Sequence, residues 1–92
     1  MGKSARERPR KLSEKLLQIR LGLGLSQNEM VEALQAKGKI SRSMVSGYEV
    51  GRREPPLLVL LKYSQLAGVH MEVLIDDKMD LPEHLPVKRK QK

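Results

Sequence analysis

Basic and small polar side chains gather in one stretch of the chain, residues 37–53. This stretch carries five lysine or arginine side chains against one glutamate, and serines stand between them. A guanidinium group can donate two parallel hydrogen bonds, either to a phosphate or to the O6 and N7 atoms of guanine. A serine hydroxyl supplies single hydrogen bonds. These residue types favour contact with a polyanion such as nucleic acid.

Two short helices, each opened by a serine, are predicted to position these side chains. Ser26 and Glu29 have the spacing of a capping box, and the helix that they start is expected to end at Gly38. Ser41 caps the next helix, residues 42–49, because its hydroxyl can accept from a free N–H of the first turn. The inward positions expected on this pair are Met30, Val31, Leu34, Val45 and Tyr48, with Ile40 packing ahead of the cap.

Three further helices are predicted around this pair. The helix nearest the N-terminus has apolar residues at helical spacing and a glycine end. The helix that follows residues 42–49 opens on a proline pair, and the last helix is short and follows His70. Their expected ranges are residues 12 to 22 or 24, 56 to 67 and 71 to 75. The predicted fold class is therefore all-α, a compact five-helix domain.

Charge divides the 92-residue chain, whose net charge is +7, into a nearly neutral body and two basic ends. We expect a basic flexible arm at 1–11, the folded domain at 12–75, and a polar, proline-containing basic tail at 76–92. Either end could contact phosphates or simply be solvated charge. The body itself has a basic pole at 37–53 and an acidic pole at 72–83, so it would orient in the field of a polyanion.

Composition bounds the cellular setting. The chain has no cysteine, which excludes disulfides and cysteine-based zinc sites and is compatible with a reducing compartment. No apolar run approaches the roughly 20 residues that a membrane-spanning helix needs. We expect a soluble, cytoplasmic, nucleoid-associated protein.

Patterns typical of catalysis are missing from the sequence. The two histidines, His70 and His84, are far apart, and we expect one to cap a helix and the other to lie in the tail. The acidic cluster at 76–80 lacks the glycine and the terminal glutamate of a calcium loop. We expect no enzyme activity, no cofactor and no metal site.

Three segments carry a specific pattern in a fixed order. They read IRLGLGLSQNEMVEAL, ISRSMVSGYEVGRREPP and LLVLLKYSQLAGVHMEVLI, and together they cover about residues 12–75. In this the chain resembles the lambda-repressor-like, Cro/CI-type helix-turn-helix family, also called the xenobiotic-response-element family. The resemblance implies a five-helix DNA-binding domain with its helix-turn-helix at about 26–50. It also implies a third helix that enters the major groove of double-stranded DNA, usually as a dimer on a two-fold operator.

The resemblance implies roles for single residues. In the family, base edges are read from the positions that match Arg42, Ser43, Ser46 and Gly47. The phosphate contacts that we expect are Gln27, Ser41, Arg52 and Arg53, with Lys37 and Lys39 in the turn before the third helix. Arg42 is the main candidate for base recognition, since its guanidinium can bind guanine twice. The alternative for Arg42 is a phosphate contact or a solvated surface position.

Two departures from the family pattern affect these roles. Gly47 stands on the face expected to be exposed, where relatives often carry a long polar side chain, so base specificity should rest on few residues. The turn between the second and third helices, Gln35 to Ile40, is about four residues longer than usual, which leaves the angle of the third helix open.

The fourth helix is apolar on most sides. Buried positions are expected at Leu57, Leu60, Leu61, Tyr63 and Ala67. Apolar side chains also stand where polar ones are usual, at Leu58, Val59 and Leu66. A helix of this kind needs cover on most sides. The cover could be a second copy of the chain, the tail with its Met79, Leu81, Leu85 and Val87, or a different protein partner.

Two hypotheses for function follow. The first is a sequence-specific transcriptional regulator of bacterial or phage type, probing double-stranded DNA with helix 42–49 and repressing as a homodimer. The alternative is an antitoxin-like or accessory module that binds a protein partner through helix 56–67.

Overall fold

The computed structural model describes residues 7–34 and 39–86, and its regular elements within these ranges are all helices. The predicted all-α class with five helices is confirmed. The helices are α1 (Leu12–Leu23), α2 (Gln27–Ala33), α3 (Arg42–Glu49), α4 (Leu57–Ala67) and α5 (Met71–Ile75).

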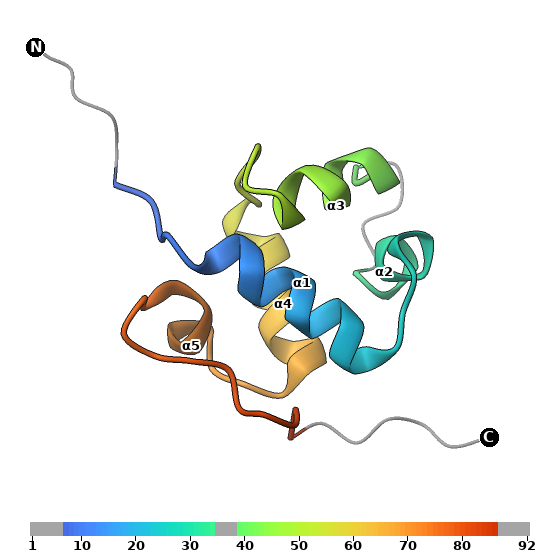
Figure 1. Ribbon diagram of the computed structural model, residues 1–92. Coiled ribbons are helices and arrows are strands. Elements are labelled where there is room, and N and C mark those ends of the chain that lie inside the picture. Colours follow the sequence, from blue (N-terminus) through green and yellow to red (C-terminus); the bar gives the residue numbers. More distant parts are fainter. Residues whose placement is uncertain (1–6, 35–38, 87–92) are drawn as a thin grey trace, which may run out of the picture.

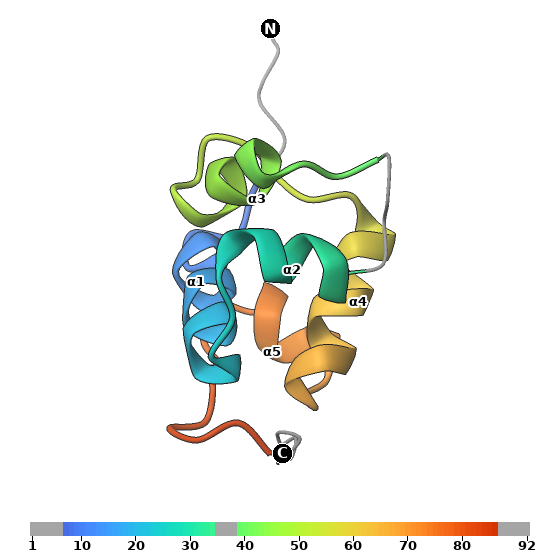
Figure 2. The ribbon, with the colours of Figure 1, turned by 90° about the vertical axis from the view of Figure 1, so that its right-hand side faces the viewer.

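Helix α1 is the central element of the fold. It contacts α3 on one side and α4 and α5 on the other, while α2 packs against α3. Figures 1 and 2 show α3 lying across one end of the molecule, over α1 and α2, with the segment after α5 at the opposite end. The helix predicted to probe a ligand therefore occupies an outer end of the domain.

The core is built from aliphatic side chains and the two tyrosines. Every predicted helix contributes to it, and its buried apolar members are Leu12, Leu16, Ile19, Met30, Leu34, Ile40, Val45, Tyr48, Leu60, Tyr63, Ala67 and Leu74. Burying side chains of this size stabilises the fold by about 1.5–3 kcal/mol each relative to exposure. This core supports α3 from below.

The two serine caps and the glycine end of α1 form as the sequence predicts. Gly24 ends α1 in the left-handed conformation, with φ +74°. The Glu29 amide donates to the Ser26 hydroxyl over 3.1 Å, and the Ser26 amide donates to the Glu29 carboxylate over 2.8 Å, which is a complete capping box. Ser41 accepts from the Met44 amide over 3.2 Å. These caps orient the amino ends of α2 and α3.

Helix α2 is shorter than the sequence predicts. It ends at Ala33 rather than near Gly38, and Leu34 follows it in a right-handed conformation with its side chain in the core. The prediction was wrong because it assumed that the helix continues to the glycine, whereas Leu34 is already its C-cap residue. Residues 35–38, and with them Lys37, lie outside the described residues.

Helix α4 is rotated relative to the expected orientation. Leu60, Tyr63 and Ala67 form its buried stripe, as predicted, and they repeat at the spacing of one helix face. Leu57 and Leu61 do not belong to that stripe and are 68% and 38% exposed, so the expectation that they are buried was wrong.

The residues expected on a partner face of α4 also differ from one another in exposure. Leu58 is 78% exposed, but Val59 and Leu66 flank the buried stripe and are partly buried against the core. The apolar surface of α4 therefore keeps Leu58 from the predicted set and is completed by Leu57 and Leu61 instead of Val59 and Leu66.

The C-terminal segment, residues 76–86, packs on α1 and not over the exposed leucines of α4. Leu81 and Leu85 lie against the core, and a Cβ atom at Gly22 would stand 3.1 Å from Leu85 Cδ1. This close approach explains why a glycine suits α1 at that position. The tail within its described part covers α1, while Val87 lies outside the described residues.

A buried lysine ties α5 to α1. The Lys15 ammonium, on a residue only 3% exposed, donates to the carbonyls of Val73 over 2.7 Å and Asp76 over 2.9 Å. These carbonyls belong to the last turn of α5 and the residue after it, where the helix dipole is negative. A helix of five residues is thereby held on the core by a cation from another helix.

The Tyr63 hydroxyl is buried with no hydrogen-bond partner in the described part of the chain. Burial raises the pKa of Tyr63 well above its ordinary value, and the negative charge of Glu49 adds to the shift. The unfolded chain therefore loses this proton at a lower pH than the folded chain. Ionisation of Tyr63 therefore leaves the free energy of unfolding unchanged below about pH 10 and lowers it as the pH rises above that value.

We predict that Tyr63→Phe leaves the free energy of unfolding at pH 7 unchanged or raises it by up to about 1 kcal/mol, since an unpaired buried hydroxyl is removed. The variant should also lose less stability than the wild type above about pH 10. Urea denaturation across this pH range measures both effects. A clear loss of stability at pH 7 would show that the hydroxyl has a partner in solution.

Candidate nucleic-acid interface

The outward face of α3 presents a small polar surface. Arg42 and Ser43 are exposed in its first turn and Ser46 is half-buried, while Val45 and Tyr48 point into the core. Met44 packs partly against the core. Arg42 is therefore the one long, charged side chain that α3 itself holds toward solvent within its first two turns.

Gly47 lies under another side chain and not on the exposed face. The residue is buried, and a Cβ atom there would stand 3.5 Å from the Arg53 side chain. Its carbonyl accepts from the Arg52 amide over 2.9 Å and the Arg53 amide over 3.2 Å. The expectation that Gly47 is exposed was wrong, because the chain turns back at Gly51, with φ +81°, and lays Arg53 over it.

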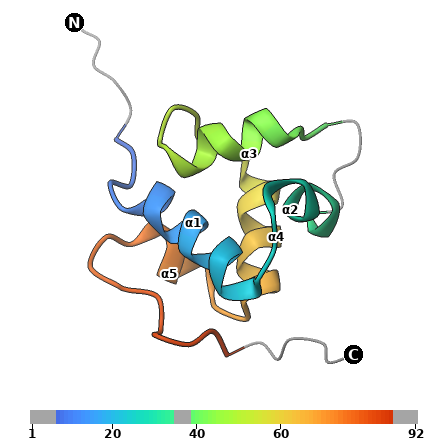
Figure 3. The same ribbon diagram turned by 45° about the vertical axis from the view of Figure 1, so that its right-hand side comes forward.

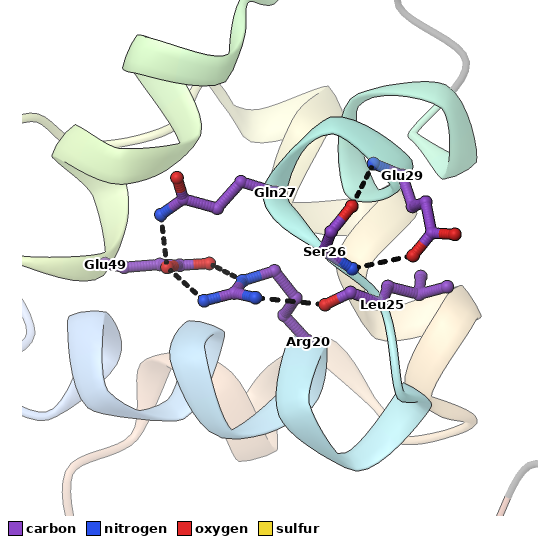
Figure 4. Close-up of polar contacts among 6 residues, drawn as sticks. All are labelled: Arg20, Leu25, Ser26, Gln27, Glu29 and Glu49. Carbon is purple, nitrogen blue, oxygen red and sulfur yellow. Dashed lines mark hydrogen bonds and ion pairs between the residues drawn. The ribbon is translucent and has the colours of Figure 1, made fainter.

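An ion pair holds α3 to α1. Arg20 Nε lies 2.6 Å from Glu49 Oε2, and Arg20 Nη2 donates to Glu49 Oε1 over 3.1 Å. Arg20 Nη1 also donates to the Leu25 carbonyl, and Gln27 Nε2 donates to Glu49 Oε1 over 3.1 Å (Figure 4). The Arg20–Glu49–Gln27 network therefore joins α1, the amino end of α2 and the carboxyl end of α3.

The electrostatics of this network favour its charged form. The hydrogen bond to Glu49 raises the pKa of Arg20, and that effect outweighs burial, which acts in the opposite direction. Glu49 is 8% exposed, so its carboxylate receives its hydrogen bonds from these donors in place of water. A two-bond contact between guanidinium and carboxylate also fixes the relative orientation of the two helices.

Sequence analysis did not identify Arg20 or Glu49 as site residues. They are 29 residues apart, so no local spacing links them. The one available signal was a charged residue at the inward side of each helix, next to positions predicted to be buried.

Gln27 is positioned in the first turn of α2 by its bond to Glu49. Its amide nitrogen is engaged within the protein, so a phosphate at this helix end would meet the remaining backbone N–H groups and the positive end of the helix dipole. The phosphate contact itself stays a prediction.

Exposed basic side chains flank α3 on both sides. Lys39 and Ser41 are exposed before the helix, and Arg52 and Arg53 are exposed after it. The residues predicted to contact phosphates are thus brought together around one end of the molecule, apart from Lys37, which lies outside the described residues.

Residues 7–34 and 39–86 form neither a membrane-spanning helix nor a metal-binding cluster. No helix there is long and apolar enough to cross a membrane. No group of three or more histidine, aspartate or glutamate side chains is placed to hold a metal ion.

The geometry defines a class: an all-helical domain that presents one capped helix, flanked by cations, on a second helix beneath it. A family model for helix-turn-helix domains matches residues 16–74. The chain belongs to this lambda-repressor-like, Cro/CI-type helix-turn-helix family, whose function is sequence-specific DNA binding. No curated protein and no solved structure matches the chain.

We predict that Glu49→Ala lowers the free energy of unfolding by about 3–5 kcal/mol, because Arg20 is left without its partner. Urea denaturation measures the change. Glu32→Ala, which removes an exposed carboxylate from α2, is the control and should act within about 0.5 kcal/mol.

A double variant separates loss of the pair from loss of one partner. Arg20→Met with Glu49→Leu should recover much of the stability, since no buried charge remains. Equal stability of Glu49→Ala and Glu32→Ala would contradict a structural role for the pair.

Proposed function

We propose that the chain is a dimeric transcriptional repressor that inserts α3 into the major groove of its operator and blocks a promoter by occupying it. The observation that carries this proposal is the outward, cation-flanked face of α3, held in place by the Arg20–Glu49 pair. A helix of this exposure and length fits the width of the major groove.

Base recognition is assigned mainly to Arg42. Its exposed guanidinium can bind the O6 and N7 atoms of one guanine, which is worth about 1–3 kcal/mol of discrimination. Ser43 and Ser46 add single hydrogen bonds. Gly47 does not join this set, because Arg53 covers it.

Phosphate contacts are assigned to residues around α3. Arg52 and Arg53 follow the helix, Ser41 and Lys39 precede it, and the amino end of α2 at Gln27 supplies N–H donors. Contacts of this kind fix the register on DNA and make the affinity salt-dependent.

We predict that Arg42→Ala relaxes the preference at one base position while leaving non-specific affinity nearly unchanged. In vitro selection from a random duplex library, run first on the wild type, supplies the operator and then the preference of the variant. The matched control is Arg52→Ala, which should weaken binding across all sequences and reduce the salt slope by about 1. A uniform loss with Arg42→Ala would make Arg42 a phosphate contact.

Dimerisation is assigned to the exposed apolar face of α4 and α5. Leu57 and Leu58 are 68% and 78% exposed, Leu61 and Ile75 are partly so, and the C-terminal segment packs elsewhere. A second copy of the chain is the occupant that we propose, since a two-fold dimer would double the contacts with DNA. The same exposed leucines favour the alternative function, an antitoxin-like or accessory module that binds a protein partner there.

We predict that Leu57→Lys with Leu58→Glu, which leaves the net charge unchanged, converts a dimer to a folded monomer. Both side chains are mostly exposed, so the core should be unaffected. Size-exclusion chromatography with light scattering measures the mass. Leu21→Gln, at an exposed leucine of α1, is the control and should remain dimeric. A wild-type monomer without affinity for any selected duplex would favour the protein-partner alternative.

A further inference from the structure

A cationic cleft lies where the chain before α1 meets the turn after α3. Its volume is about 260 Å³, and its walls include Arg8, Arg10, Ser13, Arg53 and Glu54. Figure 3 shows residues 7–11, the entry segment, beside this turn. The family match begins at residue 16, so the entry segment and Ser13 stand outside the matched helix-turn-helix.

Three arginines face this cleft against one glutamate. Arg8 Nε lies 3.7 Å from Glu54 Oε2, a long contact that leaves the Arg8 side chain 48% exposed. Arg10 and Arg53 are exposed. The cleft therefore retains an excess of positive charge and several N–H donors that solvent, or an anion, can reach.

The amino end of α1 opens on the same cleft. Leu12 and Ser13, the first two helical residues, line it, and Lys11 at the cap position supplies no side-chain bond to the helix. The positive dipole end of this 12-residue helix thus adds to the arginines, next to the Arg10 and Lys11 amides that Asp77 binds. Guanidinium groups and the positive end of a helix together suit an oxyanion with several acceptor atoms.

The cleft adjoins the proposed recognition helix. Arg53 covers Gly47 of α3 on one side and lines the cleft on the other. An anion held there would lie just beyond the carboxyl end of α3, which is where a DNA strand continues past the edges of a groove occupied by that helix.

Asp77 fixes the entry segment from the opposite side. Its two carboxylate oxygens accept separately from the Arg10 amide over 2.9 Å and the Lys11 amide over 3.0 Å. These bonds lower the pKa of Asp77. Asp80, three residues on, makes only a 3.7 Å contact with the Lys11 ammonium, and its side chain is 81% exposed. Asp77 is thus the residue that holds the backbone of Arg10 in place before any ligand binds.

We propose that this cleft binds a phosphate of the DNA backbone next to the groove that α3 occupies, and that Asp77 is the positioning residue for Arg8 and Arg10. The inference rests on the proposed function, because the ligand is the same duplex. A fixed entry segment lowers the entropy cost of ordering two arginines on binding, so an acidic residue on the far side of α1 strengthens contact with a polyanion.

The test compares Asp77→Ala with Asp80→Ala in the full chain, on the duplex selected by the wild type. Both variants lose one negative charge, so long-range electrostatics change equally. We expect Asp77→Ala to bind at least fivefold more weakly than Asp80→Ala and to show a salt slope smaller by about 1–2. Base preference should be unchanged in both. Fluorescence anisotropy between about 50 and 200 mM salt measures affinity and slope.

A second measurement does not depend on the folding of the Asp77 variant. Neutral methylphosphonate groups replace the phosphates of the duplex one at a time. Wild-type binding should weaken at a phosphate flanking each half-site, and Arg10→Ala should bind that duplex and the natural one equally.

The outcomes separate the two proposals. A wild type that binds its selected duplex, with equal slopes for the two aspartate variants and no phosphate specific to Arg10, overturns this inference alone. A wild type that selects no duplex overturns both. Stabilisation of the free chain by millimolar inorganic phosphate, lost in Arg10→Ala, would make the cleft a site for free anions and overturn the DNA assignment.

Discussion

The position of α3 depends on the ion pair between Arg20 and Glu49. Their side chains are 14% and 4% exposed, and removing such charges from water costs several kcal/mol per ion. That cost is offset in part because each partner makes a further hydrogen bond: Arg20 donates to the Leu25 carbonyl, and Glu49 accepts from Gln27. The partners come from α1, the turn after it, α2 and α3. The network thus joins α3 to α1 and α2 and fixes its orientation, in addition to the packing of Val45 and Tyr48 in the core.

Two further charged side chains join α1 to α5 and to the segment that follows α5. Asp77 lies at the amino end of α1, where the helix dipole is positive, and Lys15 reaches the carboxyl end of α5, where it is negative. Neither helix therefore needs a capping side chain of its own at that end. Helix α5 is too short to be stable by itself, and it persists because Lys15 and the buried Leu74 hold it on α1.

The sequence predicted what local chemistry decides. The helix starts at Ser26 and Ser41, the end of α1 at one of two predicted glycines, Gly24, and the buried stripe of α1 depend on residues within a few positions of one another. Their spacing is therefore visible in the chain. The rest depends on contacts between distant segments. Arg20 meets Glu49 across 29 residues and Asp77 meets Arg10 across 67, and no periodicity encodes such pairs. The predictions for the outer face of α4 and for Gly47 were wrong for the same reason, since the exposure of each depends on which distant segment packs against it.

Buried Gly47 changes how the proposed interface divides its contacts. A long side chain at that position would compete with Arg53 for the space beside α3, and the structure gives this space to Arg53. The proposed interface thus has no base-contacting side chain at this position, and the space is taken by Arg53, which also lines the cleft at the amino end of α1. Fewer base contacts lower discrimination, whereas more phosphate contacts raise affinity and its dependence on salt. The second copy proposed for the exposed face of α4 would restore discrimination, because two half-sites at a fixed spacing must both match. The small polar face of α3, the cationic cleft and the exposed leucines of α4 therefore agree with the proposed function, in which phosphate contacts would supply affinity and pairing of two copies would select the site.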